Sequence, residues 1–258
     1  MNFIQAFILS IVEGIAEFLP ISSTGHLNLV STLLHIQKTE FFKSFEIFIQ
    51  LGAITAVVFI YWKFIFENKK AWKKILAGFI PTAIIGLILY KFIKHYLLAN
   101  DLVTVIALLV GGILLIVLEL LYKEKEHHVE KIQDLSYKNA ALIGVGQALA
   151  VIPGVSRSGA TIITALFLGT KRKAAVEYSF LLAAPTMFAA TVLDLKSSNL
   201  SFSANEIKLL AIGFIGTFIF AVISIRFLLA FIQKNNFIPF GIYRIIIALL
   251  FWFLIIKP

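Results

Sequence analysis

Six apolar runs, each bounded by charged residues, limit what this chain can fold into. The chain has 258 residues, of which 60% are hydrophobic and 14% charged, and its mean hydropathy is +0.94. A soluble protein cannot bury that much apolar surface, so the sequence predicts an all-α integral membrane protein. The six predicted spanning helices comprise residues 47–62, 75–90, 102–118, 178–193, 209–225 and 240–256.

Charge and residue usage exclude other classes. A net charge of +9 could indicate nucleic-acid binding, but Lys and Arg lie in short segments between apolar runs and form no continuous stripe. The absence of cysteine excludes disulfides and thiolate chemistry. The N-terminus lacks the basic segment of a signal peptide, and Glu13 and Glu17 interrupt its apolar stretch. We therefore expect a membrane protein that surrounds itself with lipid and binds no nucleic acid.

Two further apolar stretches, residues 1–36 and 139–168, are interrupted midway. The first is broken by Pro-Ile-Ser-Ser-Thr-Gly at 20–25 and the second by Pro-Gly-Val-Ser-Arg-Ser-Gly at 153–159. Pro and Gly end helices, and Ser or Thr cap the helix that follows. Each stretch therefore predicts two short helices that meet at a turn inside the membrane, as a re-entrant hairpin. Irregular backbone at that depth must be buried in protein or line a wet cavity.

The two interrupted stretches form a weak internal repeat. Three pairs of positions share an offset of 134 residues: Glu13 with Gln147, Ser22 with Ser156, and Gly25 with Gly159. Because three apolar runs follow each stretch, we expect a single domain with a first repeat over 1–122, a linker over 123–138 and a second repeat over 139–258. Repeats of this kind with broken helices place the functional site at the repeat interface.

The distribution of Lys and Arg predicts the orientation. If the loop after the first spanning helix is cytoplasmic, that side holds 14 Lys and Arg and the other side holds seven. Both termini would then lie outside the cytoplasm. The first hairpin would enter from the outer side and the second from the cytoplasm, as inverted-topology repeats, with the catalytic cleft open to the outer side.

Glu13 and Glu17 are candidate metal ligands. Their i, i+4 spacing places both carboxylates on one helix face, roughly 6 Å apart. Carboxylates that close repel unless a proton or cation lies between them, and Mg²⁺ or Ca²⁺ would serve. The neighbouring Ile15, Ala16 and Phe18 are apolar, which argues against a solvated helix face.

The turn after Pro20 carries the candidate nucleophiles. Ser22, Ser23, Thr24 and Gly25 open a helix, whose free N–H groups favour an anion, and His26 follows. A hydroxyl beside an imidazole is the minimum set for a nucleophile and its base, whereas ordinary helix capping is the alternative. Three mechanisms remain open: attack by Ser23 with His26 as base, attack by His26, or attack by a metal-bound water.

Arg157 is the candidate phosphate-binding residue of the second stretch. A guanidinium at the start of a helix suits bidentate contact with phosphate, and an internal ion pair with Glu13 or Glu17 is the alternative. The other candidate substrate contacts are Ser156, Ser158, Gly159 and Gln147. Gln50 and Ser179 are candidate supporting residues, whereas Arg244, near the last run, is expected to be a snorkelling cytoplasmic anchor.

The segments from Glu13 to His26 and from Pro153 to Thr161 closely resemble the two signatures of the bacterial undecaprenyl-diphosphatase family, the bacitracin-resistance type. The resemblance continues through residues 48–52, 179–185 and 237–244. It implies hydrolysis of a C55 isoprenyl diphosphate, in the bacterial inner membrane, to the monophosphate carrier lipid of cell-wall synthesis. It also implies an acidic pair at Glu13 and Glu17, a nucleophile at Ser23 or His26, and phosphate contact at Arg157.

A second function class fits the same pattern. Inverted repeats with broken helices are typical of secondary transporters, here for an organic anion or a lipid phosphate. The expected partners are the isoprenyl diphosphate and membrane lipids, with a homo-oligomer as a candidate assembly.

Overall fold

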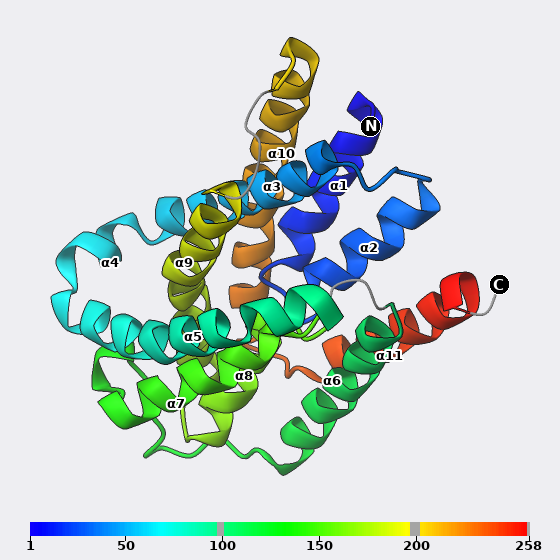
Figure 1. Ribbon diagram of the computed structural model, residues 1–258. Coiled ribbons are helices and arrows are strands. Elements are labelled where there is room, and N and C mark those ends of the chain that lie inside the picture. The colour runs from blue at the N-terminus through cyan, green and yellow to red at the C-terminus, as the bar shows by residue number, and fades with distance from the viewer. Residues whose placement is uncertain (97–100, 197–201, 257–258) are drawn as a thin grey trace.

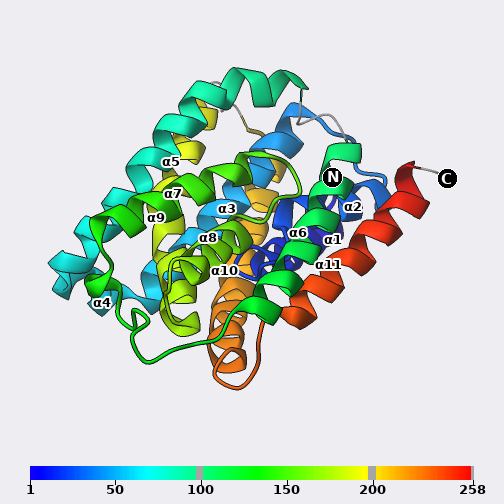
Figure 2. The same cartoon turned by 90° about the horizontal axis from the view of Figure 1, so that it is seen from below.

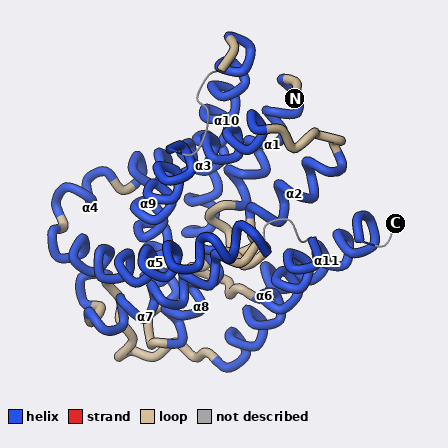
Figure 3. The backbone as a smooth tube through the Cα atoms, in the orientation of Figure 1, coloured by secondary structure: helices blue, strands red, loops and turns tan. Residues whose placement is uncertain are grey.

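The computed structural model describes residues 1–96, 101–196 and 202–256, and helices make up most of them (Figure 1; Figure 3). Within these residues the only paired extended backbone is an isolated bridge between Val129 and Thr170. The first half contains α1 (Phe3–Ala16), α2 (Ser23–Leu33), α3 (Glu40–Ile60), α4 (Trp62–Glu67), α5 (Lys69–Tyr96) and α6 (Asp101–Leu121). After a short 3₁₀ turn, η1 (Ile132–Asp134), the second half contains α7 (Tyr137–Ala148), η2 (Leu149–Val151), α8 (Arg157–Phe167), α9 (Arg172–Lys196), α10 (Ala204–Phe231), α11 (Ile238–Phe251) and the π-helical η3 (Trp252–Ile256). The predicted all-α class is confirmed for the described residues.

Five of the described helices are long and apolar enough to cross a membrane: α3, α5, α6, α9 and α10. The sixth predicted run, 240–256, lies in α11 and η3, where the apolar segment is shorter. Large apolar side chains such as Ile84, Ile88 and Leu114 are exposed on the outer faces of α5 and α6. A face of this kind is stable against lipid and unfavourable in water, so the chain is a multi-pass membrane protein.

Several helices begin earlier than the apolar runs predict. The start of α3 is at Glu40 instead of residue 47, because Thr39 Oγ1 accepts a hydrogen bond from the Phe42 N–H at 3.2 Å. The start of α10 is at Ala204 instead of 209, because Ser203 and Glu206 form a capping box. The predicted starts were wrong because capping side chains extend a helix into polar sequence that hydropathy alone treats as loop.

Each interrupted stretch folds into two short helices joined by a turn, as predicted. The pair α1 and α2 is joined by residues 17–22, and the pair α7 and α8 by residues 149–156. Ser22 and Ser156 occupy the N-cap positions and accept hydrogen bonds from the N–H groups of Gly25 at 3.4 Å and Gly159 at 3.0 Å. Ser22 has a φ of 72°, a left-handed conformation that is rare outside glycine and that concentrates at functional sites.

Helices from the two halves of the chain pack against each other. The first helix of each pair contacts a long helix of the other half, α1 on α10 and α7 on α5. The helices α6 and α11 lie side by side in both ribbon views (Figure 1; Figure 2). Loop segments lie in the middle of the molecule between α2 and α8 (Figure 3). The fold thus buries the first interrupted turn and partly buries the second where the halves meet.

Candidate active site

Glu17 joins the two helical pairs. It follows α1 directly and is 8% exposed. Its Oε2 accepts a hydrogen bond from Ser23 Oγ at 2.5 Å, and its Oε1 forms an ion pair with Arg157 Nη2 at 2.8 Å. A serine hydroxyl, a carboxylate and a guanidinium from sequence positions up to 140 residues apart are therefore in direct contact.

The guanidinium of Arg157 contacts Ser179 and Phe18 in addition to Glu17. Its Nη1 donates to the carbonyl oxygen of Ser179 at 2.9 Å, and its guanidinium lies 5.6 Å from the centroid of the Phe18 ring. The neighbouring Ser158 donates from Oγ to the Phe18 carbonyl oxygen at 2.8 Å. The internal ion pair that the sequence left open for Arg157 is thus present, with Glu17 as its partner. Phosphate contact by the same guanidinium stays a prediction.

A small cavity of about 120 Å³ lies beside Glu17, Ser23 and Arg157. It is lined by Glu17, Ser22, Ser23, Thr24, Gln50, Ala150, Val155, Ser156, Arg157 and Met187. The structure thus brings together six of the predicted site residues, from both interrupted stretches. Met187, on α9, carries no polar signal in the sequence that could have placed it here.

The hydrogen bonds of the His26 ring go to Ser22 and Tyr243 and not to the Ser23 hydroxyl. Its Nδ1 lies 2.7 Å from the Ser22 carbonyl oxygen, which can only accept, so Nδ1 carries the proton. Its Nε2 lies 2.9 Å from the Tyr243 hydroxyl, and the two rings are parallel within 3° at a centroid distance of 5.5 Å. The basic nitrogen of His26 therefore accepts from Tyr243, a contact that no local sequence pattern indicates. The group beside the Ser23 hydroxyl is Glu17.

Glu13 is fully buried, and neither carboxylate oxygen has a hydrogen-bond partner among the described residues. The Glu17 N–H donates to the Glu13 carbonyl oxygen at 2.9 Å, so the helical register that relates the two residues is intact. Mg²⁺ commonly takes one or two carboxylates and completes its shell with phosphate and water oxygens, and this pair fits that donor set. No cluster of three or more His, Cys, Asp or Glu side chains in the described ranges could hold a metal without such added ligands.

The remaining predicted contacts lie outside the cavity lining. Gln147 is buried between helices, donating to Thr82 Oγ1 and accepting from Thr161 Oγ1, both at 3.2 Å. The other three, Gly25, Ser158 and Gly159, support the turns and do not line the cavity. Because these four residues do not line the cavity, the structure does not support the substrate contacts predicted for them.

Arg244 corrects a prediction. The expected snorkelling anchor is only 1% exposed, and its guanidinium donates hydrogen bonds to backbone carbonyl oxygens inside the protein. The prediction was wrong because the run that contains Arg244 packs along α6, which places this side chain against the interior instead of the membrane boundary.

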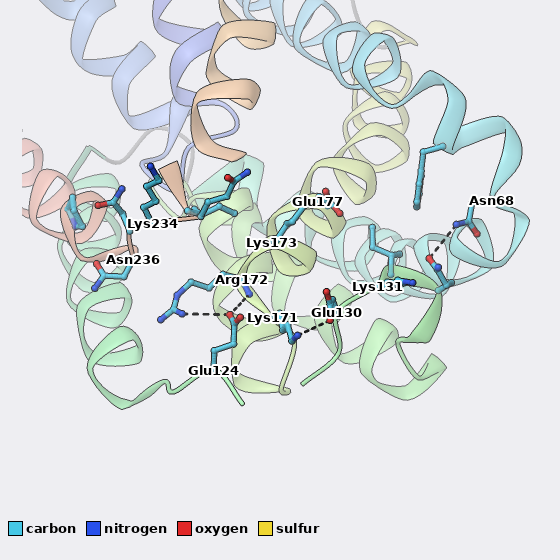
Figure 4. A pocket seen from close by; sticks show the side chains of 17 residues that line it. Asn68, Glu124, Glu130, Lys131, Lys171, Arg172, Lys173, Glu177, Lys234 and Asn236 are labelled. Atoms are coloured by element: carbon cyan, nitrogen blue, oxygen red, sulfur yellow. Dashed lines mark hydrogen bonds and ion pairs between the residues drawn. The ribbon is translucent and has the colours of Figure 1, made fainter. Parts of the chain in front are cut away.

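A second, larger cleft of about 960 Å³ shares no lining residue with the first (Figure 4). Charged residues from loops and from the start of α9 line it, with ion pairs from Lys171 to Glu130 at 2.8 Å and from Arg172 to Glu124 at 3.7 Å. The hydrogen bond between Lys171 and Glu130 lowers the pKa of Glu130 and raises the pKa of Lys171. None of the residues from the interrupted turns reaches this cleft, so the smaller cavity is the candidate active site.

The fold and site together define a multi-pass membrane protein with a buried serine and carboxylate and a half-buried guanidinium at the meeting point of two helical pairs. The family model described as bacitracin resistance protein BacA matches residues 6–250. The chain belongs to this family.

Three relatives match over almost their whole length. The chain is 53% identical over 247 residues to a protein of Aquifex aeolicus, covering 96% of both chains. It is 52% identical over 252 residues to one of Sulfurihydrogenibium sp., covering 98% of this chain and 99% of the relative. It is 49% identical over 253 residues to one of Wolinella succinogenes, covering 98% of both. All three relatives are named undecaprenyl-diphosphatase.

Proposed function

We propose that this chain is a phosphatase that hydrolyses undecaprenyl diphosphate to undecaprenyl phosphate and inorganic phosphate. The family and the shared name of the relatives support the substrate. The observation that carries the chemistry is the contact of Glu17 with both Ser23 and Arg157 at the cavity. This activity regenerates the carrier lipid for peptidoglycan synthesis, and it accounts for bacitracin resistance in a family of that name.

In this proposal Ser23 Oγ attacks the terminal phosphorus, and Glu17 accepts the hydroxyl proton. The bond between phosphorus and the bridging oxygen breaks, and undecaprenyl phosphate leaves. Water then hydrolyses the phosphoserine to inorganic phosphate. Phosphoryl transfer has a loose transition state that asks little of the base and much of positioning and positive charge. Arg157 supplies that charge, because its fork can exchange the Glu17 carboxylate for two phosphate oxygens.

His26 remains an alternative nucleophile or base. To act on the diphosphate, its Nε2 would first have to leave the Tyr243 hydroxyl, whereas the contact of Ser23 with Glu17 is already formed. The geometry therefore favours Ser23 with Glu17 over Ser23 with His26.

The experiment that tests the function separates hydrolysis from transport. Purified protein in detergent is supplied with undecaprenyl diphosphate, and inorganic phosphate is measured. Detergent micelles hold no gradient, so a phosphatase releases phosphate and a secondary transporter does not. A protein that releases none, yet moves lipid phosphate across vesicle membranes, would establish the rival class.

Activity is expected to require a divalent cation. Glu13 offers two buried oxygens that no described residue hydrogen-bonds, and Mg²⁺ or Ca²⁺ held by Glu13 and Glu17 would offset repulsion between the carboxylates and the diphosphate. Excess chelator should abolish phosphate release, and added Mg²⁺ or Ca²⁺ should restore it. Full turnover in chelator would exclude the metal.

We further propose six spanning segments in two inverted repeats, in the bacterial inner membrane, with the site open to the periplasm. The first helix of each interrupted pair packs on a long helix of the other half, α1 on α10 and α7 on α5, and this reciprocal packing supports two related halves. The asymmetry of 14 against seven Lys and Arg supports the orientation, although Lys257, which belongs to that count, lies outside the described residues.

Cysteine labelling is expected to show this orientation directly. The chain has no cysteine, and Gln37 and Lys125 are both exposed. A membrane-impermeant thiol reagent should label Gln37→Cys in intact cells and Lys125→Cys only after lysis. The reverse pattern would invert the proposed topology.

A further inference from the structure

Arg244 is a buried side chain that contacts both interrupted turns. Its Nη1 donates to the Pro20 carbonyl oxygen at 3.4 Å, and its Nη2 donates to the Gly154 carbonyl oxygen at 3.1 Å. Two further bonds reach α6: Nη2 to Ala107 at 3.0 Å and Nε to Leu108 at 3.3 Å. Four backbone carbonyls from three separate segments therefore share one guanidinium.

The two turn carbonyls occupy matching positions. Pro20 and Gly154 are 134 residues apart, the same offset that relates Ser22 to Ser156, and each lies two residues before its N-cap serine. The side chain of Arg244 thus holds the backbone just before both N-cap serines. Ser23 follows the first cap and Arg157 follows the second, so the position of Arg244 governs the distance between these two residues.

Space for Arg244 is built into α6. A Cβ at Gly111 would overlap Nη2 of Arg244, so only glycine leaves the guanidinium room at this position. Within the described ranges no Asp or Glu forms an ion pair with Arg244, which is 1% exposed. A buried charge compensated only by carbonyl dipoles leaves a positive potential in its low-dielectric surroundings. An anion bound at the adjacent turns would balance the remaining positive charge of Arg244.

We propose that Arg244 is a positioning residue for the diphosphate: it locks the two turns in register and adds positive potential to the site. The proposal rests on the proposed function for the identity of the anion. In this role Arg244 does not contact the reacting atoms. It sets the separation of Ser23 and Arg157, so its loss should slow the reaction and weaken anion binding even where the protein stays folded.

The test uses Arg244→Lys and Gly111→Ala, with Arg226→Lys as the matched control. Lysine keeps the charge but cannot bond carbonyls on three segments through a planar fork. Gly111→Ala leaves Arg244 in place in the sequence and displaces its Nη2, while alanine is the better helix former. Arg226 is exposed on α10, outside both turns.

Three quantities are measured on purified protein: kcat for undecaprenyl diphosphate, the rise in Tm with added inorganic diphosphate, and a spin-label distance between hairpins. The labels go on Leu33→Cys and Phe167→Cys, which are exposed at the ends of α2 and α8. Both test variants should lose about 100-fold in kcat, since a misplacement near 1 Å costs that much. They should need about tenfold more diphosphate for the same rise in Tm. The distance distribution should broaden, whereas Arg226→Lys should match the wild type.

Opposite results overturn the proposal. If the folded fraction of either variant keeps the kcat, diphosphate response and label distance of the wild type, Arg244 only packs α11 against α6. If Arg244→Lys does not fold, Gly111→Ala decides the question. If the wild type itself releases no phosphate, the proposed function fails, while the diphosphate response and the label distance still test the positioning role.

Discussion

Replacing Glu17 with Gln should reduce phosphate release from undecaprenyl diphosphate by about 10³-fold, in the range expected for loss of a general base. Glutamine keeps the size of the side chain but has only one acceptor oxygen and no negative charge. It therefore cannot accept hydrogen bonds from both the Ser23 hydroxyl and the Arg157 guanidinium, as the two oxygens of the Glu17 carboxylate do. Ser23 then lacks a group that takes its proton. The measurement is kcat of the purified variant in detergent.

Stability has to be measured beside the rate. Removing one partner of a buried ion pair costs about 3–5 kcal/mol, because the other charge stays buried without compensation. A lower Tm for Glu17→Gln is therefore expected, and kcat is to be compared at a temperature where the variant is folded. Glu67→Gln, at an exposed position at the end of α4, is the control and should keep the wild-type rate. A folded Glu17→Gln protein with a rate within tenfold of the wild type would exclude Glu17 from the chemistry.

Arg157→Lys should lose about 10²-fold in kcat although it keeps its charge. The planar guanidinium contacts the Ser179 carbonyl and the Glu17 carboxylate at once, and one ammonium group cannot reproduce that fork. Loss of bidentate contact also weakens the orientation of the phosphate for attack. The same assay measures the loss.

The exposed Arg226→Lys serves as the control for this exchange as well, and no change is expected there. If Arg157→Lys and Arg157→Ala both keep wild-type kinetics, Arg157 serves only the internal ion pair with Glu17.

The sequence predicted the parts of this fold that depend on local chemistry. Pro, Gly and capping Ser residues indicate where two apolar stretches must break, and both breaks fall as predicted, with Ser22 and Ser156 as N-caps. The ion pair between Glu17 and Arg157 across the two stretches is one of the two alternatives that the sequence predicts for Arg157. In each case the signal is a residue type that costs free energy in a membrane unless it has a specific role.

Contacts between distant segments could not be predicted in this way. The Ser23 hydroxyl donates to Glu17, and Ser22 at the same turn has a left-handed φ although it is not a glycine. The partner of His26 is Tyr243, 217 residues away, and the partners of Arg244 include Pro20, 224 residues away. Hydrophobic periodicity identifies helices but does not specify which helices pack together, so the side chains that α11 brings to the site carry no local signal.

The central claim, that Ser23 is the nucleophile of a site completed by Glu17 and Arg157, is tested most directly by phosphate release from Ser23→Ala. The purified variant and the wild type are each given undecaprenyl diphosphate with Mg²⁺, and binding is followed separately by the rise in Tm with inorganic diphosphate. We expect turnover to fall at least about 10³-fold, as for loss of a nucleophile, while diphosphate still stabilises the variant. Turnover within tenfold of the wild type in a folded Ser23→Ala protein would contradict the account and return the attack to His26 or to water.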